Sequence, residues 1–266
     1  APIYASGGSE EVLGKALEGG YRDKVFLVTK FGSEFVDPND SDKGTIKDSS
    51  RKNMLKSIEK SLTRLKTDHI DGYLMHWDDR VGTPIEETIA CMHELKDAGK
   101  VRFLGMSNLE QPLADRLLEG GVLDIVQYPY NMVNRTKEAL LMRYAAAGCG
   151  TMGYASLGGG ILTGQFREVP TFGPGDMRAS FYKPMFTEPG FSQIQALLKV
   201  MDGVAADHHA TKTAPRQSGS SPRKRKPSST KRSRRYTSTK DTDRGKLSCH
   251  THSRRTTSDI TSTASW

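Results

Sequence analysis

Along the first 209 residues, short apolar segments alternate with longer segments of helical spacing. The apolar segments are rich in β-branched and aromatic residues, which is typical of buried strands. They occupy residues 25–31, 69–77, 101–108, 123–131 and 151–158. This alternation predicts βα units around a parallel sheet, an α/β architecture that one chain of 266 residues is long enough to close into a barrel.

The intervening segments have the spacing of amphipathic helices. They occupy residues 9–20, 49–66, 84–100, 112–121, 136–148 and 191–209. Within 49–66, apolar residues recur at steps of three and four, as Met54, Leu55, Ile58, Leu62 and Leu65. Ser9 is expected to cap the first helix, which would end at Gly19 and Gly20. Residues 166–192, rich in Gly, Pro and Phe, predict a long loop.

Polar and aromatic residues stand at the carboxyl ends of the expected strands. In a parallel barrel these ends open on one face, where active sites are built. The residues at these ends are Lys30, His76, Ser107, Asn108, Gln127, Tyr130, Asn131 and Tyr154. We therefore interpret His76 as a residue of the barrel rim rather than of its core.

The charge of the chain is concentrated in its last part. The formal net charge is +8, yet residues 211–266 hold 15 of the 39 Lys and Arg and only 3 of the 31 Asp and Glu. These residues have almost no adjacent apolar pairs, which predicts a disordered, Ser- and Arg-rich tail. We thus expect a barrel over 1–209 and a tail over 210–266. A nucleic-acid role for the runs RKRK and KRSRR stays an alternative, although the tail lacks interleaved aromatic residues.

The three cysteines form no CxxC pair and no metal-ligand spacing, which predicts a reducing, cytoplasmic setting without a bound metal. No stretch approaches the roughly 20 apolar residues that span a bilayer, so we expect no membrane partner. The chain begins without Met, and a removed targeting segment stays an alternative.

Six motifs in register give a more specific interpretation. The segments are IYASGGSEEVLGKAL, VTKFG, YLMHW, GMSN, QYPYN and YASLGGGILTG. In this order and spacing they resemble the aldo-keto reductase family, from residue 1 to about residue 205. The resemblance implies a (β/α)8 TIM barrel that transfers hydride between NADP(H) and a small-molecule carbonyl or alcohol.

The resemblance also implies catalytic roles. Tyr4 matches the phenol that protonates the carbonyl oxygen, and Lys30 the ammonium that lowers the pKa of this phenol. His76 matches the histidine that orients and polarises the carbonyl. Trp77 matches a position that could line the substrate pocket or merely cover the rim. Asp71, inside a strand, is expected to support packing instead.

Cofactor contacts follow from the same motifs. The residues that match them are Ser107, Asn108, Gln127, Tyr154, Leu157 and Gly158. The first three match residues that bond the nicotinamide amide, and the tyrosine matches a ring that stacks on the nicotinamide. The last two begin a loop that matches the one crossing the pyrophosphate, where small residues let backbone N–H groups approach.

The chain departs from the family pattern at both ends. A family aspartate five residues before the tyrosine, the first βα unit and the second strand would all precede residue 1. In place of the final strand and helices stands the basic tail, so we expect an incomplete barrel with weakened or absent NADPH binding. Three alternatives stay open: a damaged or frame-shifted copy, a non-catalytic binding module, and a redox-sensing subunit. No motif names the substrate or the oligomeric state.

Overall fold

The five apolar segments form one parallel sheet. The computed structural model describes residues 1–37 and 40–207. Its parallel strands are β1 (Val28–Phe31), β4 (Ile70–Met75), β5 (Val101–Ser107), β6 (Ile125–Pro129) and β7 (Gly150–Tyr154). They pair in the order β1-β4-β5-β6-β7. The predicted α/β class and all five strands are therefore confirmed, with boundaries that differ by a few residues.

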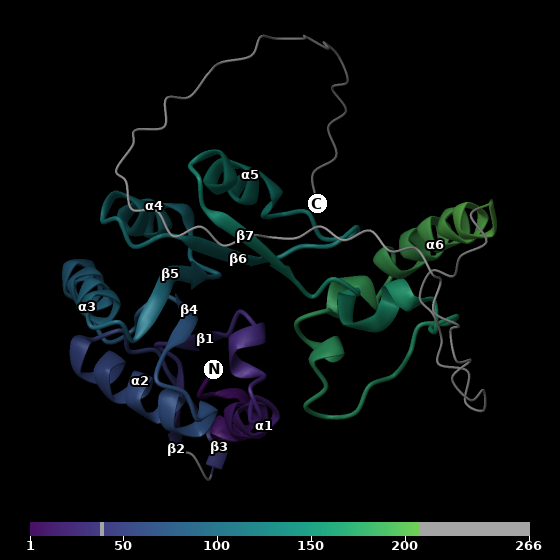
Figure 1. Ribbon diagram of the computed structural model, residues 1–266. Helices are drawn as coiled ribbons and strands as arrows, with labels where there is room; N and C mark the ends of the chain where they lie inside the picture. The colour runs from purple at the N-terminus through teal and green to yellow at the C-terminus, as the bar shows by residue number, and fades with distance from the viewer. Residues whose placement is uncertain (38–39, 208–266) are drawn as a thin grey trace, which may run out of the picture. The chain divides into compact units, whose positions relative to one another are not determined.

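The helices are α1 (Gly8–Ala16), α2 (Arg51–Leu65), α3 (Ile85–Asp97), α4 (Gln111–Glu119), α5 (Glu138–Ala146) and α6 (Gly190–Asp207). Those from α2 to α5 connect the parallel strands, as parallel neighbours require, whereas α1 precedes β1 and α6 follows β7. Short 3-10 turns add η1 (Tyr4–Gly7), η2 (Arg22–Lys24), η3 (Gly158–Thr163), η4 (Met177–Ala179) and η5 (Lys183–Met185). Figure 1 shows α2 to α5 following the strands in chain order, with α2 packed on β1 and α3 on β5.

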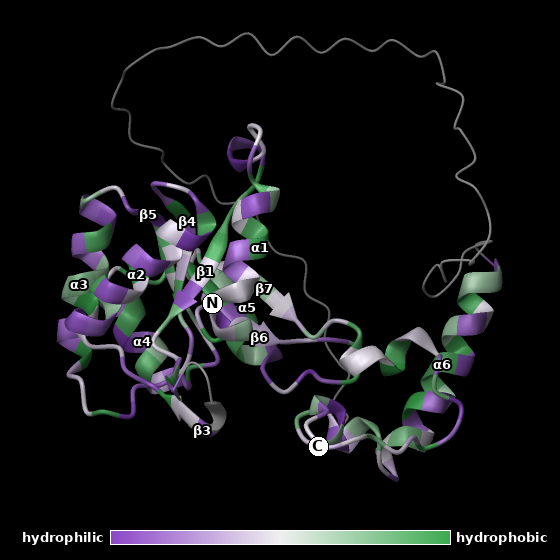
Figure 2. Cartoon of the chain, turned by 90° about the horizontal axis from the view of Figure 1, so that it is seen from below, coloured by the Kyte–Doolittle hydropathy of each residue, from purple (hydrophilic) through white to green (hydrophobic). Residues whose placement is uncertain are grey.

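Helix α2 forms as its sequence predicts. Ser50 caps it, because its side chain accepts a hydrogen bond from the Asn53 backbone N–H. The expected stripe is buried at Met54, Ile58, Leu62 and Leu65. In Figure 2, hydrophobic and hydrophilic residues alternate along α2 and α3, the pattern of helices with one face on a core.

Two expectations were wrong in detail. Ser9 does not cap α1, because the helix begins one residue earlier and Gly7 is its N-cap, at φ 96°. A Cβ at Gly7 would lie 2.9 Å from Arg64 Cδ, so glycine is required there. The first helix also ends at Ala16 rather than at Gly19 and Gly20.

A hairpin that the sequence did not predict follows β1. Strands β2 (Glu34–Asp37) and β3 (Asp40–Ile46) pair antiparallel, with Phe35 opposite Thr45. This segment is mostly polar and lacks the alternating apolar pattern from which half-buried strands are recognised. The predicted loop 166–192 is mainly irregular, but it contains η4 and η5, and α6 already begins at Gly190.

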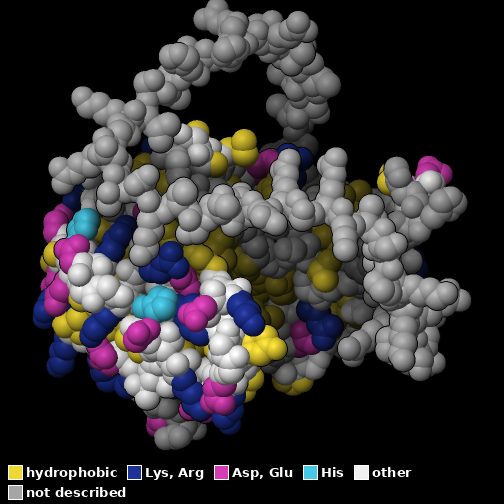
Figure 3. Space-filling view, viewed as in Figure 1, with side chains coloured by type: hydrophobic (Ala, Val, Ile, Leu, Met, Phe, Trp, Pro, Cys, Tyr) yellow, Lys and Arg dark blue, Asp and Glu magenta, His cyan; other side chains and the backbone are white. Residues whose placement is uncertain are grey.

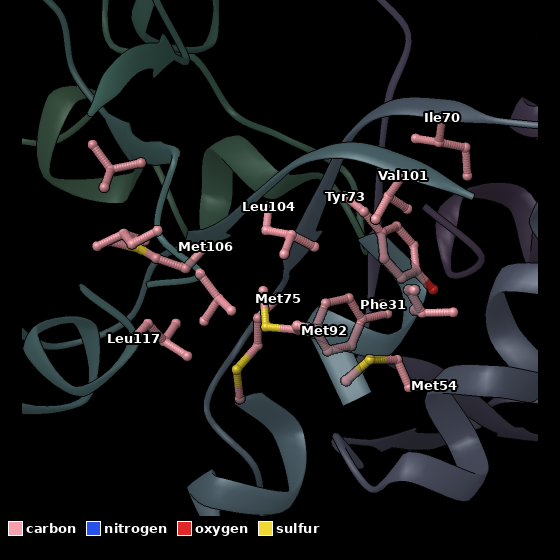
Figure 4. Packing of buried hydrophobic residues seen from close by; sticks show 14 of the residues in the cluster. Phe31, Met54, Ile70, Tyr73, Met75, Met92, Val101, Leu104, Met106 and Leu117 are labelled. Carbon is pink, nitrogen blue, oxygen red and sulfur yellow. The ribbon is translucent and has the colours of Figure 1, made fainter. Parts of the chain in front are cut away.

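The main core lies between the sheet and the helices. Alternate strand residues point to the helices, and Figure 4 shows several of them in contact with helix residues: Phe31, Tyr73, Met75, Leu104 and Met106 with Met54, Met92 and Leu117. Because strand side chains alternate, the residues between them occupy the opposite face. Lys30, His76, Ser107 and Gln127 belong to that second set.

A second apolar cluster joins η3 to α6. It contains Ile161, Leu162, Phe186, Phe191, Ile194 and Leu198. The predicted tail, 210–266, lies outside the described residues, so the division at residue 209 stays a prediction. Within 1–37 and 40–207, none of the helices combines the length and apolar character that a bilayer crossing needs.

Candidate active site

The strand ends bring most of the predicted site residues to one edge of the sheet. Strand register pairs Lys30 with Leu74 and Ser107 with Gln127. His76 directly follows β4, and its backbone N–H donates to the Phe31 carbonyl at 3.0 Å. Tyr154 ends β7. These residues thus lie at the carboxyl ends of parallel strands, as expected from the sequence.

Tyr4 reaches this edge from η1 and meets His76. The Tyr4 hydroxyl lies 3.4 Å from His76 Nε2, and the two rings are nearly perpendicular, with centroids 5.6 Å apart. His76 is 6% exposed, whereas Tyr4 is 47% exposed. A small molecule can therefore approach the phenol from solvent while the imidazole stays in place behind it.

The charge state of His76 follows from its surroundings. Burial, and next the ammonium of Lys30, lower the pKa of His76 to about 3. The imidazole is therefore neutral at neutral pH and can donate through only one ring nitrogen. Its Nδ1 atom is buried without a hydrogen-bond partner among residues 1–37 and 40–207. A neutral ring beside a phenol is suited to hold an uncharged carbonyl oxygen.

Lys30 stands beside Tyr4, and burial affects the pKa of both residues. The Lys30 Nζ lies 5.4 Å from the centroid of the Tyr4 ring, and burial lowers the pKa of this lysine. Burial raises the pKa of the Tyr4 phenol, although the sequence interpretation expected the ammonium to lower it. Desolvation of the phenolate outweighs a cation placed over the ring, so Tyr4 is a protonated O–H group at neutral pH.

The predicted nicotinamide residues form one hydrogen-bonded network. Asn108 Nδ2 donates to Ser107 Oγ at 2.9 Å and to the His76 carbonyl at 3.3 Å. Ser107 Oγ in turn donates to Gln127 Oε1 at 3.1 Å, and Tyr154 donates its hydroxyl to Asn108 Oδ1 at 2.7 Å. A nicotinamide is a planar aromatic ring that carries a carboxamide. The amide and hydroxyl groups of this network could hydrogen-bond the carboxamide, and the Tyr154 ring could stack on the planar ring, so these residues are compatible with a nicotinamide.

The glycines after Leu157 have a structural role as well. Leu157 is 50% exposed, and its carbonyl accepts from the N–H groups of Gly160 and Leu162 at 3.0 and 3.2 Å. Gly158 and Gly159 have φ values of 57° and 67°. A Cβ at Gly159 would lie 3.0 Å from the Tyr182 ring. The turn itself therefore requires small residues here, whether or not a phosphate lies against it.

Trp77 and Lys47 complete the rim near His76. The Trp77 ring is stacked near His76, with centroids 6.0 Å apart. Lys47, just after β3, places Nζ 4.8 Å from the centroid of the indole. The sequence interpretation missed Lys47, because a lysine in a polar loop carries no pattern that distinguishes it from a solvated charge.

Asp71 belongs to the opposite end of the sheet, as expected of a packing residue. It accepts from the Leu27 backbone N–H at 2.8 Å and forms ion pairs with Arg22 and Arg102 at 2.9 and 2.8 Å. It lies one residue into β4, at the strand's amino end, whereas His76 follows the carboxyl end. Its partners lock β1, β4 and β5 together rather than contact a substrate.

Comparison with known proteins places this chain in a family. The sequence model of the aldo/keto reductase family matches residues 1–215. The chain is 37% identical over 219 residues to the aldo-keto reductase YhdN of Bacillus subtilis (strain 168), covering 80% of the chain and 64% of that relative. It is 33% identical over 210 residues to the NADH-specific methylglyoxal reductase of Escherichia coli (strain K12), covering 76% and 61%.

A solved structure agrees with the fold. The structure of a glycerol dehydrogenase from Gluconobacter oxydans is similar to this chain with a TM-score of 0.72 and 31% identity, covering 79% of this chain and 64% of that one. The chain thus spans somewhat less than two thirds of the length of these relatives. This is consistent with an incomplete (β/α)8 barrel, because the five parallel strands found in residues 1–37 and 40–207 are fewer than the eight that such a barrel needs.

Proposed function

The chain belongs to the aldo/keto reductase family, and we propose that it binds NADP(H) and interconverts small aldehydes or ketones with their alcohols. The observation that carries this proposal is the contact of the Tyr4 hydroxyl with His76 Nε2 at 3.4 Å. It supports the proposal because a phenol and a neutral imidazole that lie this close could both contact one carbonyl oxygen, next to the hydrogen-bonded side chain of Asn108.

In the reductive direction the carbonyl oxygen would lie between Tyr4 and His76. His76 Nε2 would orient the oxygen, and the Tyr4 O–H would donate its proton as negative charge develops there. A bound nicotinamide supplies the hydride that the carbonyl carbon accepts. The carbonyl thereby gains one hydride and one proton and becomes an alcohol.

Lys30 would act after the proton has left Tyr4. The phenolate then carries a charge that burial disfavours, and an ammonium next to its ring reduces this penalty. Because burial also lowers the pKa of Lys30, the lysine can return a proton to the tyrosine more readily than a solvated lysine could.

Four residues would hold the nicotinamide in register with this point. Ser107, Asn108 and Gln127 would hydrogen-bond its carboxamide, and the Tyr154 ring would stack on the nicotinamide and fix its orientation. The names of the relatives mention both cofactors. One relative is an NADH-specific methylglyoxal reductase, and another, from Schizosaccharomyces pombe, is an aldo-keto reductase whose name includes NADP(+). NADPH is the cofactor that we propose for this chain.

The test is a fluorescence titration of the full chain with NADPH and with NADH, followed by turnover of a generic aldehyde. Saturable NADPH binding together with aldehyde-dependent NADPH oxidation supports the proposal. A chain that binds neither nucleotide refutes the cofactor assignment. NADPH binding without turnover of any aldehyde or ketone would instead favour a sensing role for the bound nucleotide.

A further inference from the structure

Lys47 occupies a fixed place at the rim of the candidate site. Its backbone carbonyl accepts a hydrogen bond from the Arg80 N–H at 2.8 Å, which ties the segment after β3 to the loop after Trp77. Its half-buried side chain holds Nζ 4.8 Å from the centroid of the Trp77 indole. Trp77 is itself stacked near His76, and the charge of Lys47 is among those that act on the His76 imidazole.

The positive charge of Lys47 has no carboxylate partner within the described parts of the chain. Most other surface cations do have one: Arg51 pairs with Glu94, Arg143 with Asp115 and Lys137 with Glu110. Figure 3 shows cationic and anionic side chains interspersed over the visible surface. Lys137 and Arg143 also lie near aromatic rings, but each has a carboxylate partner as well, whereas within the described residues the Lys47 ammonium contacts the Trp77 ring alone.

Two of the carboxylates close in sequence to Lys47 and Trp77, those of Asp48 and Asp79, accept hydrogen bonds from backbone N–H groups. Asp48 accepts from the Ser50 N–H at 2.9 Å. Asp79 accepts from the backbone N–H groups of Ser49, Val81, Gly82 and Thr83. Asp78 acts on the Tyr128 phenol, and its Oδ1 atom is buried without a hydrogen-bond partner among residues 1–37 and 40–207. The charges that act on His76 are those of Lys30, the chain's amino terminus and Lys47, and all of them are cationic.

We propose that the substrate carries a carboxylate a short chain away from its carbonyl, and that Lys47 binds this carboxylate over the Trp77 ring. This inference rests on the proposed carbonyl chemistry and specifies its substrate class. A single ammonium on a flexible stem matches one negative charge, whereas phosphate sites generally use Arg forks or clustered backbone N–H groups. Trp77 would pack against the methylene groups that join the two ends.

Partial burial makes this contact strong enough to measure. A hydrogen bond to a charged group contributes about 1.5–3 kcal/mol, which corresponds to roughly a tenfold to hundredfold difference in affinity. The contact would be the same in the ground state and the transition state, because the carboxylate does not react. Its loss should therefore raise KM and leave kcat much less affected.

The kinetic test compares 4-oxobutanoate with its methyl ester, which has the same carbonyl and no charge. For Lys47→Gln we expect the ratio of kcat/KM for the acid to that for the ester to fall at least tenfold, mainly through KM. Lys47→Arg should keep most of the preference, because it keeps the charge. Lys56→Gln, which removes an exposed lysine on α2, is the matched control and should keep the wild-type ratio. An unchanged ratio in Lys47→Gln overturns the proposal.

A binding test separates this inference from the proposed activity. The chain has two tryptophans, so a Trp266→Phe background leaves Trp77 as the sole reporter. Titration with succinate should change Trp77 fluorescence saturably, and Lys47→Gln should abolish that change. If this holds while neither aldehyde is turned over, the activity fails and the carboxylate site stands. If the ester is reduced and succinate has no Lys47-dependent effect, the activity stands and this inference is wrong.

Discussion

Tyr154 donates its hydroxyl to Asn108 Oδ1 at 2.7 Å, across the strand that separates them. Tyr154 ends β7 and Asn108 follows β5, with β6 between. The amide nitrogen of Asn108 then donates to Ser107 Oγ and to the His76 carbonyl. Tyr154, which we propose stacks on the nicotinamide, is therefore linked through the side-chain amide of Asn108 to His76, which we propose orients the carbonyl.

Tyr154→Phe should weaken NADPH binding while preserving the stacking ring. The substitution removes one partner of a half-buried amide, which costs about 1–3 kcal/mol. We expect the Kd for NADPH to rise roughly tenfold, measured by fluorescence titration. Tyr130→Phe is the matched control, because the Tyr130 hydroxyl bonds Glu138 outside the network at 2.7 Å. Equal effects of the two substitutions would argue against a special role for the Tyr154–Asn108 bond.

Tyr4→Phe should reduce turnover without abolishing nucleotide binding. Loss of a positioned general acid typically lowers the rate roughly a hundredfold to ten-thousandfold. The measurement is kcat for NADPH oxidation with a generic aldehyde, accompanied by NADPH titration of the same variant. Turnover by Tyr4→Phe at the wild-type rate would exclude Tyr4 as the proton donor.

The sequence predicted the positions of the site residues in two simple steps. Apolar segments identify the strands that Lys30, Ser107 and Gln127 belong to, and the carboxyl ends of parallel strands meet at one edge of the sheet. Neither step needs tertiary detail. The resemblance added the roles of these residues, but their mutual distances came only from the structure.

Features that depend on a contact between distant segments were not predictable. Lys47 gains its position only when the segment after β3 meets Trp77, and a lone lysine carries no periodic signal. The effect of burial on the pKa of Tyr4 depends on which groups exclude water from the phenol, and no sequence pattern reports those groups. Gly7 replaced Ser9 as the cap of α1 because Arg64, 57 positions away, leaves room only for glycine.

Glu10→Ala should destabilise the fold strongly. Glu10 is 3% exposed; it accepts from Thr29 Oγ1 at 2.6 Å and pairs with Arg64 Nη2 at 2.6 Å. Removing it leaves a partly buried guanidinium unpaired, which costs about 3–5 kcal/mol. The free energy of unfolding, from urea titration, measures the change. Glu11→Ala, at an exposed position of the same helix, should change it by no more than about 0.5 kcal/mol.

His76 should make the stability of the chain fall with acidity over a defined window. The ring has an ordinary pKa of 6.5 when unfolded and a pKa lowered to about 3 when folded. Between these values the unfolded chain binds a proton that the folded chain does not, so the free energy of unfolding rises with pH. The contribution to the free energy of unfolding is complete above pH 6.5 and is lost as pH falls toward 3. It amounts to about a few kcal/mol.

His76→Gln removes the titrating ring, so the difference in unfolding free energy between wild type and variant should change with pH across this window. Carboxylates that titrate in the same range are present in both proteins and cancel in that difference. A difference that is constant from pH 3 to pH 6.5 would show that the folded imidazole is not held neutral.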